Sequence, residues 1–174
     1  MEREGDKTVH TVNFGGNMKP QFNNNYQGIR CRVYLVRENT NSETIIIRNS
    51  EDVHELVKDE LVNSDREMML SVMLTCGNHL IGVETVCIGS IDKITISTRE
   101  IFKSAILSNA CSIVLCHNHP SGELTPSNED LNITKNLIDA GELMGIKLLD
   151  HIIVSNKGYK SLNDDGLFPD ERRN

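Results

Sequence analysis

The 174-residue sequence contains no tryptophan, and aromatic residues make up only 4% of it, so a hydrophobic core must be mostly aliphatic. No apolar stretch approaches the roughly 18 residues that a membrane-spanning helix requires, and we expect no membrane span. The N-terminal sequence Met-Glu-Arg-Glu-Gly-Asp lacks the basic-then-apolar order of a signal peptide. These absences predict a soluble, intracellular protein.

The sequence also lacks an excess of positive charge. It has 18 Lys and Arg residues against 25 Asp and Glu residues, which gives a formal net charge of −7. Non-specific binding to nucleic acids depends on Lys and Arg displacing counterions from the phosphate backbone. The sequence has no run of five or more like charges either. Non-specific nucleic-acid binding is therefore not expected.

The cysteines follow no disulfide framework, because their number is odd and no CxxC pair occurs. Four of the five lie within or beside apolar runs, where a free cysteine behaves as a small hydrophobic residue. This pattern predicts free thiols in a reducing, cytoplasmic setting. The five are Cys31, Cys76, Cys87, Cys111 and Cys116.

With 174 residues, the chain is long enough for one compact domain with its own core and too short for two. Four parts are expected along it. Residues 1–28 are polar and rich in Asn, Gly and Gln, and are predicted to form a flexible leader. N-terminal strands and a helix are expected over residues 29–66 and the main core over residues 67–160. A polar C-terminal tail is expected over residues 161–174.

Hydrophobic patterning predicts strands that alternate with helices, and this alternation favours an α/β fold. Helices are expected to begin with a hydroxyl N-cap at Ser50, at Ser97 or Thr98, and at Ser127. The last helix is expected to end at Gly145. Its expected apolar positions are Leu131, Leu137, Ile138 and Leu143. Strands are expected over residues 31–36, 44–47, 68–75, 80–88, 112–116 and 146–154.

The segment from His117 to Asp130 (HNHPSGELTPSNED) carries the most specific signal. His117 and His119 follow a buried strand, and a proline and a glycine directly after them turn the chain, so both imidazoles can converge. Asp130 lies in the first turn of the helix that begins at Ser127. Two imidazoles and one carboxylate, with a fourth position left for water, form the ligand set of a catalytic zinc site.

A catalytic zinc site needs further groups. Zinc lowers the pKa of bound water and so provides a nucleophile near neutral pH. A general base and a donor for the oxyanion complete the chemistry. Ser127 is a candidate donor, with helix capping as its alternative role. The candidate bases are Glu67, Glu84 and Glu100, although Glu100 is also favoured by the helix dipole alone.

Two other residues near the motif are assigned structural roles. Cys116 adjoins His117 but alternates away from it along the strand, so it is expected to pack in the core. His151 follows Asp150 in the last strand. It is expected to line the cleft or to satisfy a neighbouring strand end, and not to bind the metal.

The spacing His117-x-His119-Pro120 followed by Ser127-x-x-Asp130 resembles the JAMM metal signature of MPN-type zinc peptidases and deubiquitinases. Several blocks resemble the bacterial RadC branch of that superfamily, over about residues 50 to 160. The blocks are Arg99-Glu100-Ile101-Phe102, His117 to Gly122, Thr125-Pro126-Ser127 and Leu149-Asp150-His151-Ile152.

The resemblance implies a curved mixed β-sheet flanked by helices, the JAMM/MPN architecture that is related to cytidine deaminases. It implies Zn²⁺ as the cofactor, with His117, His119 and Asp130 as ligands. In the order of elements typical of the family, Glu67 matches the catalytic glutamate. Glu67 is therefore preferred over the other two glutamates as the general base.

The function implied is a zinc-dependent metallopeptidase or isopeptidase-type amide hydrolase that acts on a peptide or protein substrate. Amide hydrolysis on a small molecule is also compatible with such a site. An alternative from another class is a DNA-repair-associated accessory protein with a structural or vestigial metal site. Longer RadC proteins carry a helix-hairpin-helix segment ahead of this domain, but residues 1–28 show no such pattern. The sequence identifies neither the substrate nor the oligomeric state.

Overall fold

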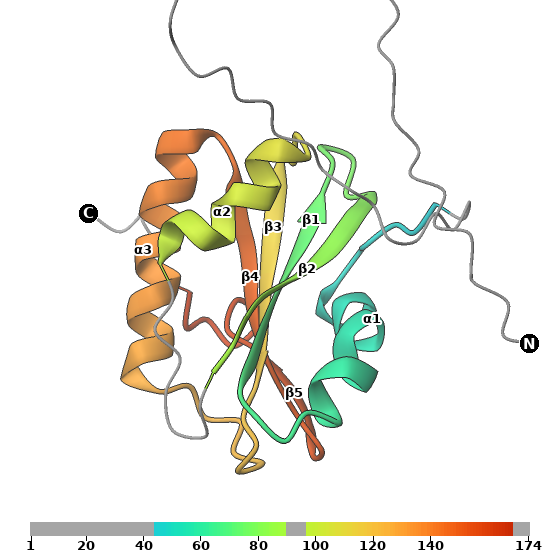
Figure 1. Cartoon of the computed structure of the whole chain (residues 1–174), viewed down its shortest axis with the longest axis vertical. Helices are drawn as coiled ribbons and strands as arrows, with labels where there is room; N and C mark the ends of the chain where they lie inside the picture. The colour runs from blue at the N-terminus through green and yellow to red at the C-terminus, as the bar shows by residue number, and fades with distance from the viewer. Residues whose placement is uncertain (1–43, 90–96, 169–174) are drawn as a thin grey trace, which may run out of the picture. The chain divides into compact units, whose positions relative to one another are not determined.

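A computed structural model describes residues 44–89 and 97–168, and over these ranges the strands form one sheet in the order β2-β1-β3-β4-β5 (Figure 1). β3 and β4 are parallel, whereas the other neighbouring strands pair antiparallel. The mixed sheet confirms the predicted α/β class. The predicted leader and the predicted strand over residues 31–36 lie outside the described ranges. The strands are β1 (Met68–Leu74), β2 (Leu80–Ile88), β3 (Ser112–Asn118), β4 (Lys147–Ser155) and β5 (Gly158–Ser161).

Helices cover both faces of the sheet, with α1 on one side and α2 and α3 on the other (Figure 1). Each face therefore has its own hydrophobic cluster. None of the described helices is long and apolar enough to cross a membrane. The helices are α1 (Ser50–Val62), α2 (Thr98–Leu107) and α3 (Asn128–Met144).

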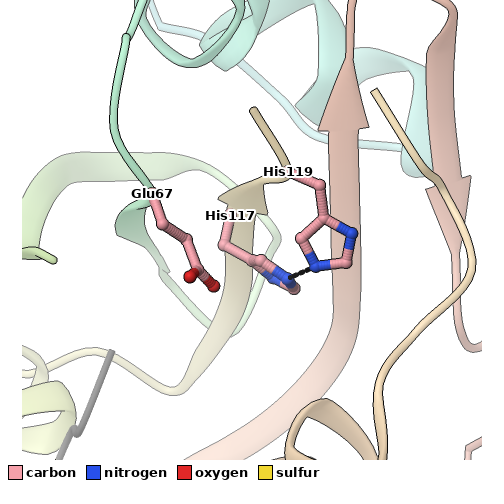
Figure 2. A group of neighbouring side chains, drawn as sticks. All are labelled: Glu67, His117 and His119. Carbon is pink, nitrogen blue, oxygen red and sulfur yellow. Dashed lines mark hydrogen bonds between the residues drawn. The ribbon is translucent and has the colours of Figure 1, made fainter. Parts of the chain in front are cut away.

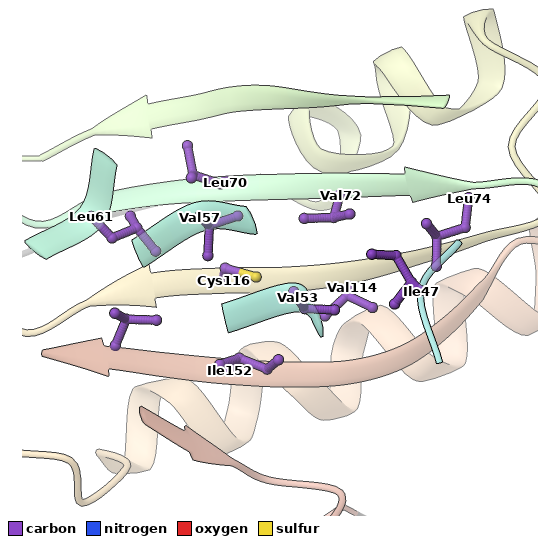
Figure 3. Packing of buried hydrophobic residues seen from close by; sticks show 11 residues of the cluster. Ile47, Val53, Val57, Leu61, Leu70, Val72, Leu74, Val114, Cys116 and Ile152 are labelled. Carbon is purple, nitrogen blue, oxygen red and sulfur yellow. The ribbon is translucent and has the colours of Figure 1, made fainter. Parts of the chain in front are cut away.

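The cluster under α1 is aliphatic and well buried (Figure 3). Val53, Val57 and Leu61 follow helical spacing and point from α1 onto the sheet. Every residue of β3 is buried, as the sequence predicts for a strand covered on both faces. Cys116 lies in this cluster, which confirms its predicted packing role, and burial raises the pKa of its thiol.

The helix ends agree with the sequence in two of three cases. Ser97 accepts a hydrogen bond from the backbone N–H of Arg99, and Ser127 caps α3. The prediction that Ser50 caps α1 was wrong by one residue. Asn49 is the N-cap, and its side chain accepts from the backbone N–H of Asp52 at 2.8 Å. Asn and Ser are about equally favourable as N-cap residues, so the sequence alone does not indicate which of these two neighbours caps the helix.

Two other predictions need correction. Leu143 is 91% exposed, because the buried stripe of α3 runs through other positions. The predicted strand over residues 44–47 makes only a single bridge, between Ile46 and His79. Beyond β5 the chain stays packed, since Leu162 is fully buried. The buried residues of α3 are Asp130, Thr134, Leu137 and Gly141.

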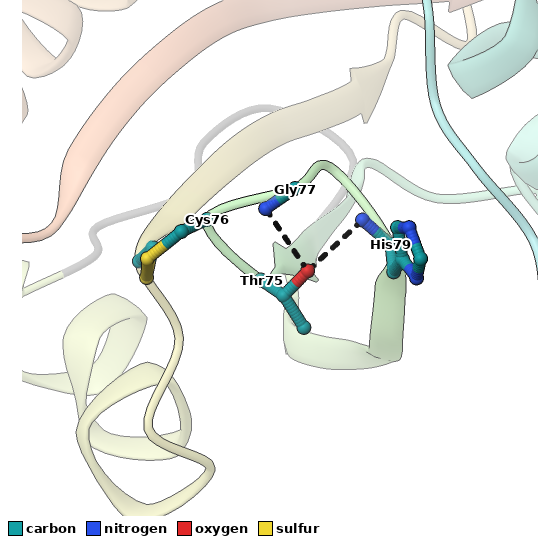
Figure 4. The surroundings of a disulfide bond; sticks show 5 residues. Thr75, Cys76, Gly77 and His79 are labelled. Atoms are coloured by element: carbon teal, nitrogen blue, oxygen red, sulfur yellow. Dashed lines mark hydrogen bonds between the residues drawn. A yellow bond between two sulfur atoms is a disulfide. The ribbon is translucent and has the colours of Figure 1, made fainter.

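A disulfide joins Cys76, in the turn after β1, to Cys111, just before β3 (Figure 4). The backbone N–H of Cys111 also donates to the carbonyl of Leu74 at 2.9 Å. The prediction of free thiols was therefore wrong for this pair. Antiparallel pairing of β1 with β3 brings the two residues together across 35 positions of sequence, and spacing alone does not reveal such a contact. The cysteine pattern consequently no longer supports a reducing compartment.

Candidate metal centre

The two histidines of the motif meet at the end of β3. His117 is the second-to-last residue of β3. It is fully buried and pairs with Met69 on β1 and with Ile153 on β4. His119 follows directly after the strand. Its carbonyl accepts a hydrogen bond from Gly122, which has a φ of 76°. This turn brings the Nε2 atoms of the two rings to 2.9 Å from each other, as the sequence predicts (Figure 2).

Asp130 brings a carboxylate from the first turn of α3 to the same point. Its Oδ1 lies 3.2 Å from Nε2 of His117, and its Oδ2 lies 3.5 Å from Nε2 of His119. Oδ2 also accepts hydrogen bonds from the backbone N–H and the hydroxyl of Ser127, both at 2.7 Å. Oδ1 accepts from neither donor of Ser127 and lies beside Nε2 of His117.

Glu67 is the one of the three candidate glutamates that reaches this cluster (Figure 2). It directly precedes β1, whose start lies beside the end of the antiparallel strand β3. Ligand atoms of Glu67, His117 and His119 all lie within 4.8 Å of one another. Glu84 instead lies mid-strand in β2. Glu100 forms an exposed ion pair with Lys103 at 2.8 Å.

Asn118, between the two histidines, holds the backbone on both sides of Glu67. Its Oδ1 accepts from the N–H of Met68 at 2.7 Å, and its Nδ2 donates to the carbonyl of Arg66 at 2.9 Å. The carbonyl of Glu67 itself accepts from the N–H of Gly89 at 2.8 Å. Asn118 is 2% exposed, and its role was missed from the sequence, because its partners lie 50 positions or more away.

The outer nitrogens of both rings are engaged, which leaves each Nε2 facing the cluster. Nδ1 of His119 donates to the carbonyl of Glu123 at 2.8 Å. Nδ1 of His117 lies 2.8 Å from Nε2 of His151, a residue on β4. His151 is fully buried behind His117, and burial lowers its pKa well below the usual value. The sequence predicts that His151 lines the cleft or satisfies a neighbouring strand end, and its contact with His117 at the end of β3 fits the second alternative.

The carboxylate of Asp130 and the imidazole of His119 shift each other's pKa values in favour of their charged forms. Burial alone would raise the pKa of Asp130, but hydrogen bonds to His117 and His119, together with that from Ser127, lower it far below its ordinary value. The hydrogen bond to Asp130 is also the main reason that the pKa of His119 is raised. An ionised carboxylate therefore faces the two imidazoles at neutral pH.

Ser127 has the capping role that the sequence offers as one of two alternatives. Its hydroxyl accepts from the N–H of Asp130 at 3.1 Å and donates to Oδ2 of the same residue. Together with the bond from the N–H of Ser127, this forms a capping box around the start of α3. The arrangement fixes the rotamer of Asp130 and aims its carboxylate at the histidines.

The residues present fit a divalent transition metal. Two imidazole nitrogens, a carboxylate oxygen and an adjacent second carboxylate are a donor set that Zn²⁺ prefers in sites that keep an open position. The outer contacts of both rings match the hydrogen bonds that usually orient metal-binding histidines. The cluster contains no cysteine, unlike most structural zinc sites.

Comparison with known proteins identifies the family. The model of the RadC-like JAB domain matches residues 47–167, which include the whole cluster and all five strands of the sheet described above. The chain belongs to the RadC-like JAB domain family. The resemblance of the HNHPSG and TPS blocks to the RadC branch is thereby confirmed.

Relatives of this RadC-like JAB domain occur in several bacteria. A UPF0758 protein of Desulforamulus reducens is 46% identical over 123 residues, which cover 71% of this chain and 54% of that protein. One of Desulfitobacterium hafniense is 37% identical over 142 residues, covering 80% and 63%. One of Caldanaerobacter subterraneus is 42% identical over 129 residues, covering 74% and 55%. The chain thus spans between about half and two thirds of the length of these relatives.

Proposed function

We propose that this RadC-like JAB domain is a zinc-dependent metallopeptidase or isopeptidase-type amide hydrolase that acts on a peptide or protein substrate. The observation that carries the proposal is the convergence of four side chains at the end of β3. These side chains, two imidazoles and two carboxylates, come from β3, the loop after it, α3 and the residue before β1. They are His117, His119, Asp130 and Glu67.

In this proposal, the metal ligands are His117, His119 and Asp130. Glu67 acts first as general base and then as general acid. Zinc, when bound, would polarise the amide carbonyl and make a water molecule more acidic. Glu67 lies beside both imidazoles without a direct hydrogen bond to either, so its carboxylate is free to accept a proton from that water. The same carboxyl would then deliver the proton to the leaving nitrogen, which completes hydrolysis of the amide.

Ser127 is the proposed donor to the developing oxyanion, in addition to its capping role. Its hydroxyl proton points at Oδ2 of Asp130 and would have to turn toward the substrate. Oδ2 would keep the hydrogen bond from the backbone N–H of Ser127 at 2.7 Å, so Asp130 would stay oriented during that rotation. Positioning of the carboxylate and donation to the oxyanion are compatible for this reason.

Metal content per chain, on protein purified without chelator, is the experiment that tests the proposal. About one zinc per chain is expected for the wild type, and its loss is expected in His119→Ala and Asp130→Ala. Glu67→Gln is the matched control, since it should keep the zinc and lose the hydrolysis of amide substrates in a peptidase screen.

Two results would reject the proposal. One is a wild-type protein that takes up no zinc even when zinc is supplied. The other is equal zinc content in the wild type and both ligand variants. A protein that keeps zinc, cleaves no peptide and binds DNA with a steep dependence on salt would instead support the accessory, DNA-associated function.

A further inference from the structure

A buried chain of hydrogen bonds leads from the back of His117 to α3. Nδ1 of His117 lies 2.8 Å from Nε2 of His151, and Nδ1 of His151 lies 2.6 Å from Oγ1 of Thr134. Thr134 Oγ1 in turn donates to the backbone carbonyl of Asp130 at 2.6 Å. His117, His151 and Thr134 are all fully buried, so no solvent competes for these contacts.

The hydrogen bond from Thr134 to the carbonyl of Asp130 fixes which atom donates in each of the other hydrogen bonds of this series. A carbonyl oxygen only accepts, so the single hydroxyl proton of Thr134 is committed to Asp130. Thr134 must then accept from His151, which places the His151 proton on Nδ1. A neutral His151 consequently has its lone pair on Nε2, where it accepts from the Nδ1–H of His117. A neutral His117 then has its lone pair on Nε2, which faces Asp130 and His119, whereas a protonated His117 donates from Nε2 to Asp130.

The opposite direction would have a clear chemical consequence. If Thr134 donated to His151, Nε2–H of His151 would donate to Nδ1 of His117. The proton of a neutral His117 would then be on Nε2, the atom that faces the cluster, and an N–H cannot coordinate a metal. The direction of the chain thus decides whether His117 offers a lone pair or a proton to the site.

We propose that His151 and Thr134 are positioning residues that hold neutral His117 in the tautomer with its Nε2 lone pair directed into the cluster. The arrangement links His117 to Asp130, because the chain that starts at one ends on the carbonyl of the other. Its consequence for zinc binding rests on the proposed function. The tautomer of His151 is a property of the protein without metal, because it depends only on the contacts with Thr134 and His117.

The sheet explains why these residues can meet. β4 is parallel to β3, and His151 pairs with Leu115, two residues before His117. The side chains of His151 and His117 therefore project from the same face of the sheet. Thr134 lies one helical turn after Asp130 in α3, so it points at the same place. Met69 pairs with His117 and Leu115 pairs with His151, and both belong to the hydrophobic cluster under α2 and α3. The two histidines therefore lie on the face of the sheet that α3 covers.

Long-range ¹H–¹⁵N spectra of the imidazoles in the metal-free protein test the proposal directly. In the wild type, His151 is expected to carry its proton on Nδ1 and to leave Nε2 unprotonated. Thr134→Ser keeps the hydroxyl and should keep this tautomer. Thr134→Val has nearly the same shape but no acceptor, and should shift His151 toward the Nε2–H tautomer.

Zinc affinity, measured by competition with a chromogenic chelator, supplies the second readout. Thr134→Val should bind zinc about 10- to 100-fold more weakly than the wild type, and Thr134→Ser should restore most of this loss. An Nε2–H tautomer of His151 in the wild type, or an unchanged tautomer in Thr134→Val, would overturn the proposal. Equal affinities of the Val and Ser variants would overturn its consequence for the metal. A wild type that binds no zinc would refute the proposed function, while the spectra would still decide the tautomer.

Discussion

Met69 on β1 lies directly opposite His117 on β3 in the antiparallel register. Glu67, two residues before Met69, is consequently carried to the end of β3, where the imidazoles meet. Asn118 holds the backbone on either side of it by two hydrogen bonds. The place of the proposed general base is therefore determined by backbone pairing and by one buried amide.

Replacement of Asn118 by Ala should lower kcat for amide hydrolysis by roughly 10- to 100-fold, because a small displacement of the general base is costly. The unpaired backbone groups of Met68 and Arg66 should also reduce the free energy of unfolding by about 1–3 kcal/mol. A double-mutant comparison with Glu67→Gln provides the check, since Asn118→Ala should have little further effect on the rate in that background. Additive rate losses would show that Asn118 acts elsewhere.

The contribution of His119 to the stability of the metal-free protein should fall as the pH rises through neutrality. The hydrogen bond to Asp130 raises the pKa of folded His119 above its unfolded value of about 6.5. This contribution is fully present below about pH 6.5 and is lost as the pH rises through the folded pKa. Thermal unfolding of chelator-treated protein between about pH 6 and 8.5 should show this decline, and His119→Gln should show less of it.

Added zinc should reverse this trend, because protons and the metal compete for the same imidazole. The stabilisation that zinc provides should therefore increase with pH over the same range. A chelator-treated wild type whose pH profile matches that of His119→Gln would contradict the interaction between His119 and Asp130.

Gly141→Ala should destabilise the domain by about 1–3 kcal/mol, measured by urea unfolding. A Cβ at this position would overlap the backbone carbonyl oxygen of Ile146, and a backbone atom cannot move aside as a flexible side chain does. Asp139→Ala, on the exposed side of the same helix, is the control and should change stability by less than about 0.5 kcal/mol. Equal stabilities of the two variants would show that α3 and the following strand can separate freely.

Loss of the Cys76–Cys111 disulfide should cost about 3–4 kcal/mol of unfolding free energy, from the closure of a 35-residue loop. Cys76→Ser should show this loss under oxidising conditions and should equal the wild type when both are fully reduced. Cys87→Ser, which replaces a half-buried free thiol, should leave the effect of the reductant unchanged. A wild type with the same denaturation midpoint with and without reductant would contradict the prediction.

The sequence predicts best what is encoded locally. His117, His119, Ser127 and Asp130 lie within one short segment whose strand end, turn and cap are all readable from neighbouring residues. Periodicity was less reliable where a helix only partly contacts the sheet, as the exposure of Leu143 shows. The choice of Glu67 required the family resemblance, because no pattern in the residues around Glu67 indicates that it lies close to the histidines.

Contacts that depend on strand register were not predictable in the same way. The partners of Asn118, the contact of His151 with Thr134 and the pairing of Cys76 with Cys111 all join segments that are distant in sequence. Each of them exists only because a particular residue of one strand lies opposite a particular residue of the next. A single sequence contains the residues but not that alignment.

The ladder between β1 and β3 is tied at both of its ends. Beyond the Leu74–Ser112 pair lies the disulfide, and beyond the Met69–His117 pair lies the cluster with Glu67. A slip of one residue would turn Glu67 to the opposite face and separate the two cysteines. Chains that complete folding with these strands misaligned would therefore carry neither feature. The disulfide and the cluster of imidazoles are therefore present together only in molecules whose β1 and β3 pair in the native register, and not in compact molecules with misaligned strands.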